Sequence, residues 1–136
     1  MPTNQVQSGR AAHAFAQVSR GYERAGADAK EYAASCKKLP MLIKINGLVP
    51  ALLFAREKKQ FGSKEYSLEE AVMSWLRDAG SPVSQLLQGK SDIGDLTGLT
   101  SRQYRLVTAE VQRYLSWVKR FAAARRAEDK SDGSGE

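Results

Sequence analysis

The chain has 136 residues and a formal net charge of +6, a size that fits one domain around a single hydrophobic core. Helix-favouring residues are plentiful, only four prolines occur, and no segment alternates apolar and polar residues, so we expect an all-α single-domain bundle of about five or six helices and no sheet. A single cysteine excludes an intrachain disulfide. With no signal peptide at the N-terminus, we expect the protein to be cytoplasmic.

The N-terminal part of the chain predicts one long helix from about Asn4 to Lys38. Its apolar side chains follow one another at spacings of three and four residues, which is typical of a helix that packs along a neighbour at a shallow angle. This stripe comprises Phe15, Val18, Tyr22, Ala25, Ala29, Tyr32 and Cys36. Gly21 and Gly26 lie within the segment, and each disfavours helix, so we expect a bend near them.

The longest apolar run is Leu39–Phe54, which has only Lys44 and Asn46 as polar side chains. It is too short and too polar for a membrane span, which needs about 20 apolar residues. We therefore predict a core segment that the rest of the protein surrounds on most sides. Pro40 fits the first turn of a new helix, and the Asn46-Gly47 pair predicts a break before a second helix that begins near Leu48 with Pro50 in its first turn.

The middle of the chain predicts shorter elements. After a loop over residues 60–66, Ser67 and Glu70 fit a capping box that opens a helix ending at Gly80. We expect this helix to bury Leu68, Val72, Trp75, Leu76 and Ala79. A second short helix is expected over residues 81–89, and residues 91–98 have the composition of a polar connection.

A final helix is predicted from Thr100 to about Arg126. Thr100 and Gln103 fit a capping box, and Leu99 with Tyr104 fits a hydrophobic staple. The expected apolar side comprises Tyr104, Val107, Val111, Tyr114, Leu115, Val118, Phe121 and Ala122. Residues 127–136 are acidic and rich in Gly and Ser, so we expect a disordered tail after a helical domain spanning residues 1–126.

The sequence offers no convincing catalytic or metal site. His13 and Cys36 are the only residues of their kinds, and on one continuous helix they would lie roughly 35 Å apart. We expect a partly exposed histidine and a small core cysteine. Asp92 and Asp95 are the remaining alternative, as weak Mg²⁺ ligands, but aspartates in a Gly-containing connection usually serve turns. We therefore expect no enzyme activity, no cofactor and no metal.

Positive charge is the strongest functional indication. Without its last ten residues the chain has 20 basic and 11 acidic side chains, which favours a polyanionic partner such as nucleic acid. Residues 100–126 contain seven basic side chains against one acid, Glu110. On a helix, Arg102, Arg113 and Arg120 fall within about 20° of one another, opposite the apolar stripe. Arg105 and Lys119 flank them, and together these five are candidate nucleic-acid contacts.

A second candidate group surrounds the central apolar segment. It comprises Lys37, Lys38, Lys44 and Asn46, with Arg56, Lys58 and Lys59 at the end of the segment. Lys44 and Asn46 have structural alternatives, since Lys44 can extend its ammonium group to solvent and Asn46 can cap the following helix. Contact with phosphates by at least one of the two basic groups is our expectation.

Two blocks of the sequence resemble a known family. They are KKLPMLIKINGLVPALLF, residues 37–54, and YRLVTAEVQRYLSWVKRFAAA, residues 104–124. With the helical pattern before them, they are similar to the small helical subunit of the type III-B CRISPR effector, the Cmr complex; the type III-A counterpart is similar in size and character. The matching positions are Leu39, Pro40, Ile43, Asn46, Gly47, Leu48, Ala51, Tyr104, Arg105, Thr108, Glu110, Leu115, Trp117, Lys119 and Arg120. Pro50 departs from the family pattern.

The resemblance implies an all-helical, non-catalytic subunit that stacks head to tail with copies of itself beside larger backbone subunits. These filaments hold the guide RNA and the paired target RNA in antiviral defence. By matching position, Lys44, Asn46, Arg105, Lys119 and Arg120 become candidates for the RNA-facing or subunit-facing surface. A helical protein–protein adaptor with only non-specific RNA binding is the alternative function.

Overall fold

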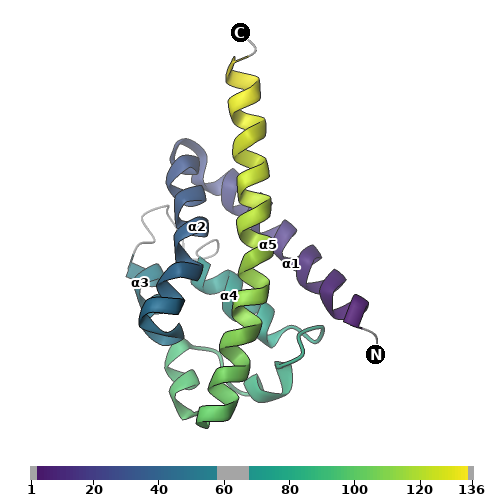
Figure 1. Ribbon diagram of the computed structural model, residues 1–136, viewed down its shortest axis with the longest axis vertical. Coiled ribbons are helices and arrows are strands. Elements are labelled where there is room, and N and C mark those ends of the chain that lie inside the picture. Colours follow the sequence, from purple (N-terminus) through teal and green to yellow (C-terminus); the bar gives the residue numbers. More distant parts are fainter. Residues whose placement is uncertain (1–2, 58–67, 135–136) are drawn as a thin grey trace.

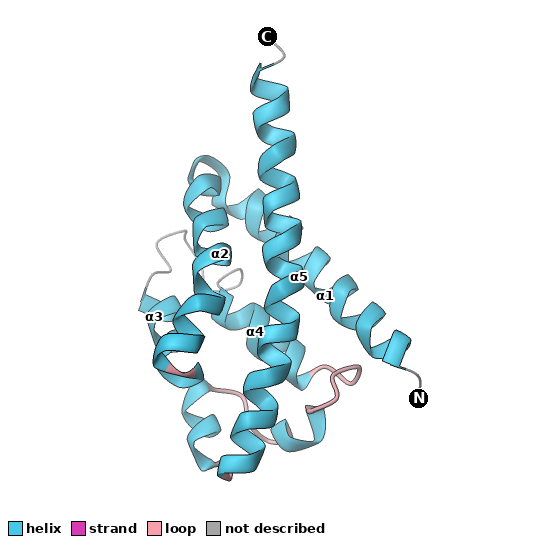
Figure 2. Ribbon diagram, in the orientation of Figure 1, coloured by secondary structure: helices cyan, strands magenta, loops and turns pink. Residues whose placement is uncertain are grey.

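The computed structural model describes the backbone of residues 3–57 and 68–134, and the side chains of residues 5–57 and 68–128. Within these ranges the fold contains five α-helices, three short 3-10 helices and no strand, which confirms the all-α prediction (Figure 2). The helices are α1 (Thr3–Ala25), η1 (Gly26–Asp28), α2 (Ala29–Asn46), α3 (Leu48–Glu57), α4 (Leu68–Arg77), η3 (Ser84–Leu87), η4 (Ile93–Gly98) and α5 (Ser101–Ser134).

The long helix α5 is the axis of the bundle. It runs the length of the molecule, with α2 beside it and α1 crossing it obliquely (Figure 1). The buried side of α5 is the predicted one, because Val107, Val111, Tyr114, Leu115, Val118 and Ala122 are all at most 2% exposed. Spacings of three and four positions recur among these residues, which places them on one side of the helix against the other elements.

The predicted N-terminal helix is two helices. α1 ends at Ala25. Gly26, the first residue of η1, adopts φ +53°, a left-handed conformation that suits glycine, and α2 follows η1. Of the two glycines near which a bend was expected, only Gly26 interrupts the helix, since α1 is unbroken at Gly21. Instead, Gly21 lies against the ring of Tyr32 on α2, so closely that a Cβ at this position would overlap the ring. The single-helix prediction was therefore wrong, and His13 and Cys36 lie on different helices.

The apolar stripe predicted for this region is correct except at its start. Val18, Tyr22, Ala25, Tyr32 and Cys36 are buried, and Ala29 is half-buried. Phe15, however, is 58% exposed. It lies on α1 before the stretch that α2 covers, and its ring contacts Phe121 of α5 instead.

The break between α2 and α3 falls at Gly47, as predicted, with φ +93° and Pro50 in the first turn of α3. The predicted helix start at Pro40 is wrong, since α2 runs through that residue between buried Leu39 and Ile43. Packing on both sides of the proline offsets the backbone hydrogen bond it removes. The α3 amide of Val49 donates to the Tyr104 hydroxyl at 2.9 Å.

Burial of the central apolar segment differs from the prediction. Leu39, Ile43, Leu48, Ala51 and Leu52 are buried, but Met41 and Ile45 are 59% and 69% exposed, and Leu53 and Phe54 are also exposed. The segment therefore forms two amphipathic helices with apolar side chains on their outer surface. The prediction of a segment surrounded on most sides was wrong, because the outward side of each helix is exposed.

The elements between α3 and α5 are mostly shorter than predicted. The loop over residues 60–66 and the Ser67 cap lie outside the described residues. α4 ends at Arg77, so Ala79 is exposed rather than buried, while the other predicted core residues of this helix are buried. The predicted helix over residues 81–89 is the 3-10 turn η3. In the predicted connection, Asp92 and Asp95 form a capping box for η4, which buries Ile93 and Leu96.

Both ends of α5 test the prediction for the last helix. At its start the Thr100 hydroxyl accepts from the Gln103 amide at 3.1 Å, and the Gln103 side chain accepts from the Thr100 amide at 2.9 Å, which confirms the capping box. At its end α5 continues beyond Arg126 to Ser134, later than predicted. The division into a body and a tail at residue 126 stays a prediction.

Candidate nucleic-acid interface

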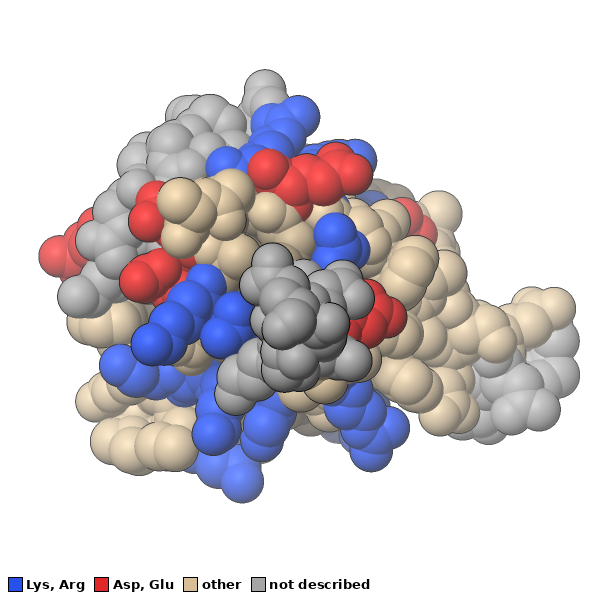
Figure 3. All heavy atoms as spheres, turned by 90° about the horizontal axis from the view of Figure 1, so that it is seen from above, with Lys and Arg blue, Asp and Glu red and all other residues tan. Residues whose placement is uncertain are grey.

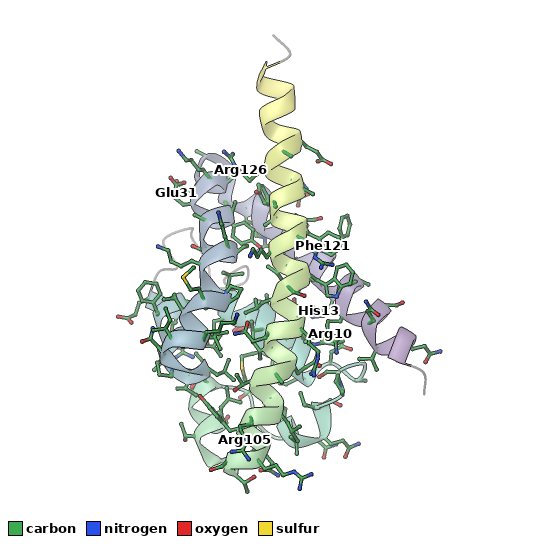
Figure 4. The ribbon with its side chains drawn as sticks, in the orientation of Figure 1. Arg10, His13, Glu31, Arg105, Phe121 and Arg126 are labelled. Carbon is green, nitrogen blue, oxygen red and sulfur yellow. The ribbon has the colours of Figure 1, made fainter. Side chains whose placement is uncertain are left out.

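The basic side chains predicted on the last helix lie on the solvent side of α5. Arg102, Arg105, Arg113, Lys119 and Arg120 are all exposed. Arg102, Arg113 and Arg120 lie opposite the buried stripe, and Arg105 and Lys119 flank them. Figure 4 shows Arg105 near the beginning of α5. The arrangement presents guanidinium and ammonium groups in a row along the axis of the bundle.

Most of the second basic group lies on α2, the helix that packs beside α5. Lys37, Lys38, Lys44 and Asn46 are exposed residues of α2. The two helices are joined by a hydrogen bond from the Gln112 side-chain amide to the Pro40 carbonyl, at 3.0 Å. Asn46 is the last residue of α2, and Gly47 separates it from α3, so Asn46 does not act as the cap of the following helix.

Figure 3 shows how charge is distributed over the molecule as seen from above. Lys and Arg gather along the lower edge of this view, the side of α2 and α5 that faces the reader in Figure 1, and most of the acidic side chains lie elsewhere. A surface with one sign of charge over two helices attracts polyanions and keeps acidic surfaces away.

The one acid in residues 100–126 is turned inward. Glu110 is 1% exposed and accepts two hydrogen bonds from Arg10 of α1, at 2.6 and 2.7 Å. It also accepts from the indole N–H of Trp75 at 2.8 Å. Arg113 approaches the same carboxylate only to 3.9 Å and stays exposed. Glu110 therefore satisfies a buried arginine and does little to neutralise the exposed row.

Lys58 and Lys59 lie outside the described residues. Arg56 differs from the other candidates because two carboxylates bind its half-exposed guanidinium. Its Nε donates to Glu69 at 2.9 Å, and Nη2 donates to both Glu69 and Asp92 at 2.5 Å. These carboxylates raise the pKa of Arg56, and the guanidinium in turn lowers the pKa of Asp92. The triad joins α3, α4 and the segment before η4. Contact between Arg56 and nucleic acid stays a prediction. Two carboxylates already neutralise the positive charge of Arg56, unlike that of the other candidates.

The histidine and the cysteine both belong to the interior packing. His13 shares hydrogen bonds with Tyr114 at 2.8 Å and Ser74 at 3.1 Å, and burial lowers its pKa. Cys36 is fully buried, which raises the pKa of its thiol to about 12, so it is protonated at neutral pH. Among the described residues no group of three or more His, Cys, Asp or Glu side chains converges as metal ligands would.

Sequence reasoning missed two clusters that the fold assembles. The first is the buried Arg10–Glu110–Trp75 network, which joins α1, α4 and α5. Glu110 lies between Val107 and Val111 on the inward side of its helix, and that position is the only sequence indication of its burial. The second is a set of aromatic rings between α1 and α5, which includes the exposed Phe15.

No helix in the described ranges is long and apolar enough to cross a membrane. No curated protein sequence gives a significant match to the chain. The family model of the CRISPR-associated protein (Cas_Cmr5) matches residues 6–125, which include nearly all of the helical body and every candidate contact described above. The chain therefore belongs to the Cas_Cmr5 family of small CRISPR-associated Cmr subunits.

Proposed function

We propose that this Cmr subunit is a non-catalytic, RNA-binding part of a type III-B effector and that it contacts RNA through one surface of α2 and α5. The surface, here called the basic face, comprises Lys37, Lys38, Lys44, Arg102, Arg105, Arg113, Lys119 and Arg120. Its single-sign charge is the observation that carries the proposal. Among the described residues, the only acid within ion-pair distance of any of these eight is Glu110, which Arg113 approaches to 3.9 Å.

The side chains of the basic face suit phosphates better than bases. Lysine and arginine on exposed helix surfaces form charge-assisted hydrogen bonds with phosphate oxygens, and such contacts carry no sequence information. A subunit that supports many different guide and target sequences needs this kind of contact. RNA paired in an A-form duplex is read in the same way, by its backbone and its shape.

The acidic side chains support the non-catalytic part of the proposal. Asp92 and Asp95, the alternative Mg²⁺ ligands, cap η4, and Asp92 also binds Arg56. Glu69 binds Arg56, and Glu110 binds the buried Arg10. These four carboxylates therefore have structural partners, and hydrolytic chemistry needs several converging groups that remain available to substrate.

Family membership implies assembly with other Cmr subunits, and the exposed apolar side chains of α2 and α3 support protein contacts. Met41 and Ile45 lie one turn apart on the outside of α2, and Leu53 and Phe54 lie on α3. We propose that the subunit stacks with copies of itself and contacts the larger backbone subunits, alongside the guide RNA and target RNA. Stacking head to tail requires two different surfaces on each protomer.

The charge reversal Arg113→Glu with Arg120→Glu tests the basic face. We expect weaker binding of RNA, and a log–log salt dependence that is flatter by about 1.4 if each arginine neutralises one phosphate of a single strand. The matched control is Arg77→Glu with Lys90→Glu, which changes net charge equally on α4 and the loop before η4. Equal loss of affinity in both double variants would show that only net charge matters and would overturn the basic face as the site.

Purification of the tagged subunit from its own host tests the partners. Recovery of larger CRISPR subunits together with short RNAs that share a repeat-derived end would support the proposal. If protein partners are recovered without RNA, and their binding changes little with salt, the alternative function of a protein–protein adaptor is favoured.

A further inference from the structure

A row of aromatic rings continues from the basic face toward α1. The guanidinium of Arg120 lies 5.3 Å from the ring centroid of Trp117, and Trp117 stacks on Phe121 with centroids 5.8 Å apart. Phe121 in turn forms a T-shaped contact with Phe15, with ring centroids 5.3 Å apart. We call these four residues the aromatic ladder. The side of α5 that carries Phe121 faces the crossing helix α1 in Figure 4.

The far end of the ladder is open to solvent. Phe15 is 58% exposed, the most exposed aromatic side chain among the described residues, whereas Trp117 and Phe121 are half-buried. Next to Phe15 is a groove between α1 and α5, whose apolar walls are Phe15, Val18, Phe121 and Ala124. Exposing a phenylalanine beside an apolar groove costs free energy in the isolated protein, which a ligand on this surface would recover.

Charge at the ladder favours an anionic ligand. Arg120 belongs both to the ladder and to the basic face, so the two surfaces are continuous. Arg125 lines the groove and lies over the Tyr22 ring at 5.3 Å, and Glu128 is the only acidic side chain among the lining residues. A ligand that combines flat aromatic surface with negative charge meets both features.

We propose that the aromatic ladder is a stacking site for an unpaired nucleobase of RNA, with Phe15 as the exposed platform. This inference rests on the proposed RNA-binding function. Aromatic side chains stack on any base, because every base has a π-face, and arginine adds cation–π attraction. A base within a duplex already has neighbours on both faces, so the site would take a base of a single strand or one displaced from its pair.

Binding of two single-stranded RNAs of equal length and charge tests the proposal. One carries ordinary bases, and the other has abasic residues over a central stretch. For the wild-type full chain we expect tighter binding of the first, and roughly fivefold to hundredfold loss of that affinity in Phe15→Ala, the range for one stacked base. Phe15→Tyr should retain the affinity. All variants should bind the abasic strand equally, because their basic faces are identical.

Phe15→Leu separates stacking from docking of an apolar protein segment. Leucine keeps apolar surface but has no aromatic face, so we expect it to behave like Phe15→Ala toward the base-containing strand. Thermal unfolding monitors folding of every variant, and little change is expected because Phe15 is largely exposed. A Phe15→Leu variant with wild-type RNA affinity would overturn the proposal. It would also be overturned if Phe15→Ala weakened the capture of other Cmr subunits while Phe15→Leu did not, because that result indicates docking of an apolar protein segment.

Failure of this inference can be told apart from failure of the proposed function. If charge reversal at Arg113 and Arg120 weakens binding of both strands while the wild type does not distinguish them, RNA binding by the basic face stands and the stacking site is wrong. If charge reversal leaves the affinity for both strands unchanged, the basic face itself is wrong, and the stacking site loses its premise.

Discussion

Arg10 and Arg113 approach the same carboxylate from two environments. Arg10 is 9% exposed and makes two hydrogen bonds with Glu110, at 2.6 and 2.7 Å, whereas the Arg113 side chain is 62% exposed and approaches only to 3.9 Å. In the interior a lost partner leaves a charge without solvation, but at the surface water replaces it. The interior of α5 thus uses charge for stability, and its exterior keeps charge available for binding.

Removal of the Glu110 carboxylate should have the largest effect on the interior side of this comparison. We expect Glu110→Ala to lower the free energy of unfolding by about 3–5 kcal/mol, because Arg10 would remain buried without a counter-charge and Trp75 without an acceptor. Chemical denaturation measures the change. Most of the stability should return in Arg10→Met with Glu110→Met, where no buried charge is left. A Glu110→Ala variant as stable as the wild type would show that the network contributes little to stability.

The close approach of α1 and α2 should be the next most sensitive place. Gly21→Ala would put a methyl group into the ring of Tyr32, a side chain that is 2% exposed and cannot move freely. We expect a loss of roughly 1–3 kcal/mol in unfolding free energy, as for other overpacked sites. Gly98→Ala is the matched control, because nothing lies within 4 Å of its added Cβ. Equal stability of both variants would contradict this contact.

His13 should make the stability of the interior depend on pH. Burial lowers its pKa in the folded protein, so the unfolded chain binds more protons as pH falls through the usual histidine pKa of about 6.5. Stability should therefore be highest above this pH and fall below it, until the folded histidine also protonates. The neighbouring charges are Asp78, which raises the pKa, and Arg20, which lowers it.

Comparison with His13→Gln isolates this contribution. The difference in unfolding free energy between wild type and variant should change with pH between neutrality and mildly acidic conditions and be constant above neutrality. Asp92 acts in a separate range: its lowered pKa makes it stabilising above its usual value, with loss only in stronger acid. A pH profile identical in both proteins would contradict the assignment to His13.

The smallest stability effect is expected on the outer side of α5. Arg113→Glu with Arg120→Glu should change the free energy of unfolding by less than about 0.5 kcal/mol per site, because both residues are exposed. RNA affinity should nevertheless fall. Glu110→Ala should therefore lower stability, and the double arginine variant should lower RNA affinity, although all three residues lie on α5. A large loss of stability in the double arginine variant would remove the distinction between the two sides.

Much of the fold was predictable where local pattern and tertiary packing agree. The capping box of Thr100, the break at Gly47 and the buried stripe of α5 all depend on residues within one or two turns. Errors occurred where a distant segment decided the outcome. Pro40 looked like a helix start, but α2 continues through it, with Leu39 and Ile43 buried against the rest of the bundle.

The candidate site shows the same division. Sequence spacing alone placed Arg102, Arg113 and Arg120 on one side of a helix, and the structure leaves all three exposed. Spacing could not show that the helix carrying Lys37, Lys38 and Lys44 packs against α5. Nor could it show that two carboxylates bind Arg56 or that Phe15 is exposed to solvent. Each of these depends on which elements lie side by side.

By itself the sequence determined the helical class, the family and the charge of the outer surface. Helix periodicity and family motifs depend on residues close together in the chain, and net charge depends on composition alone. Only the tertiary structure decided which charges are buried and which are available. Glu110 belongs to the interior because α1 and α4 bring Arg10 and Trp75 to it, across 100 and 35 positions of sequence. A side chain's environment depends on such distant partners, and local periodicity holds no information about them.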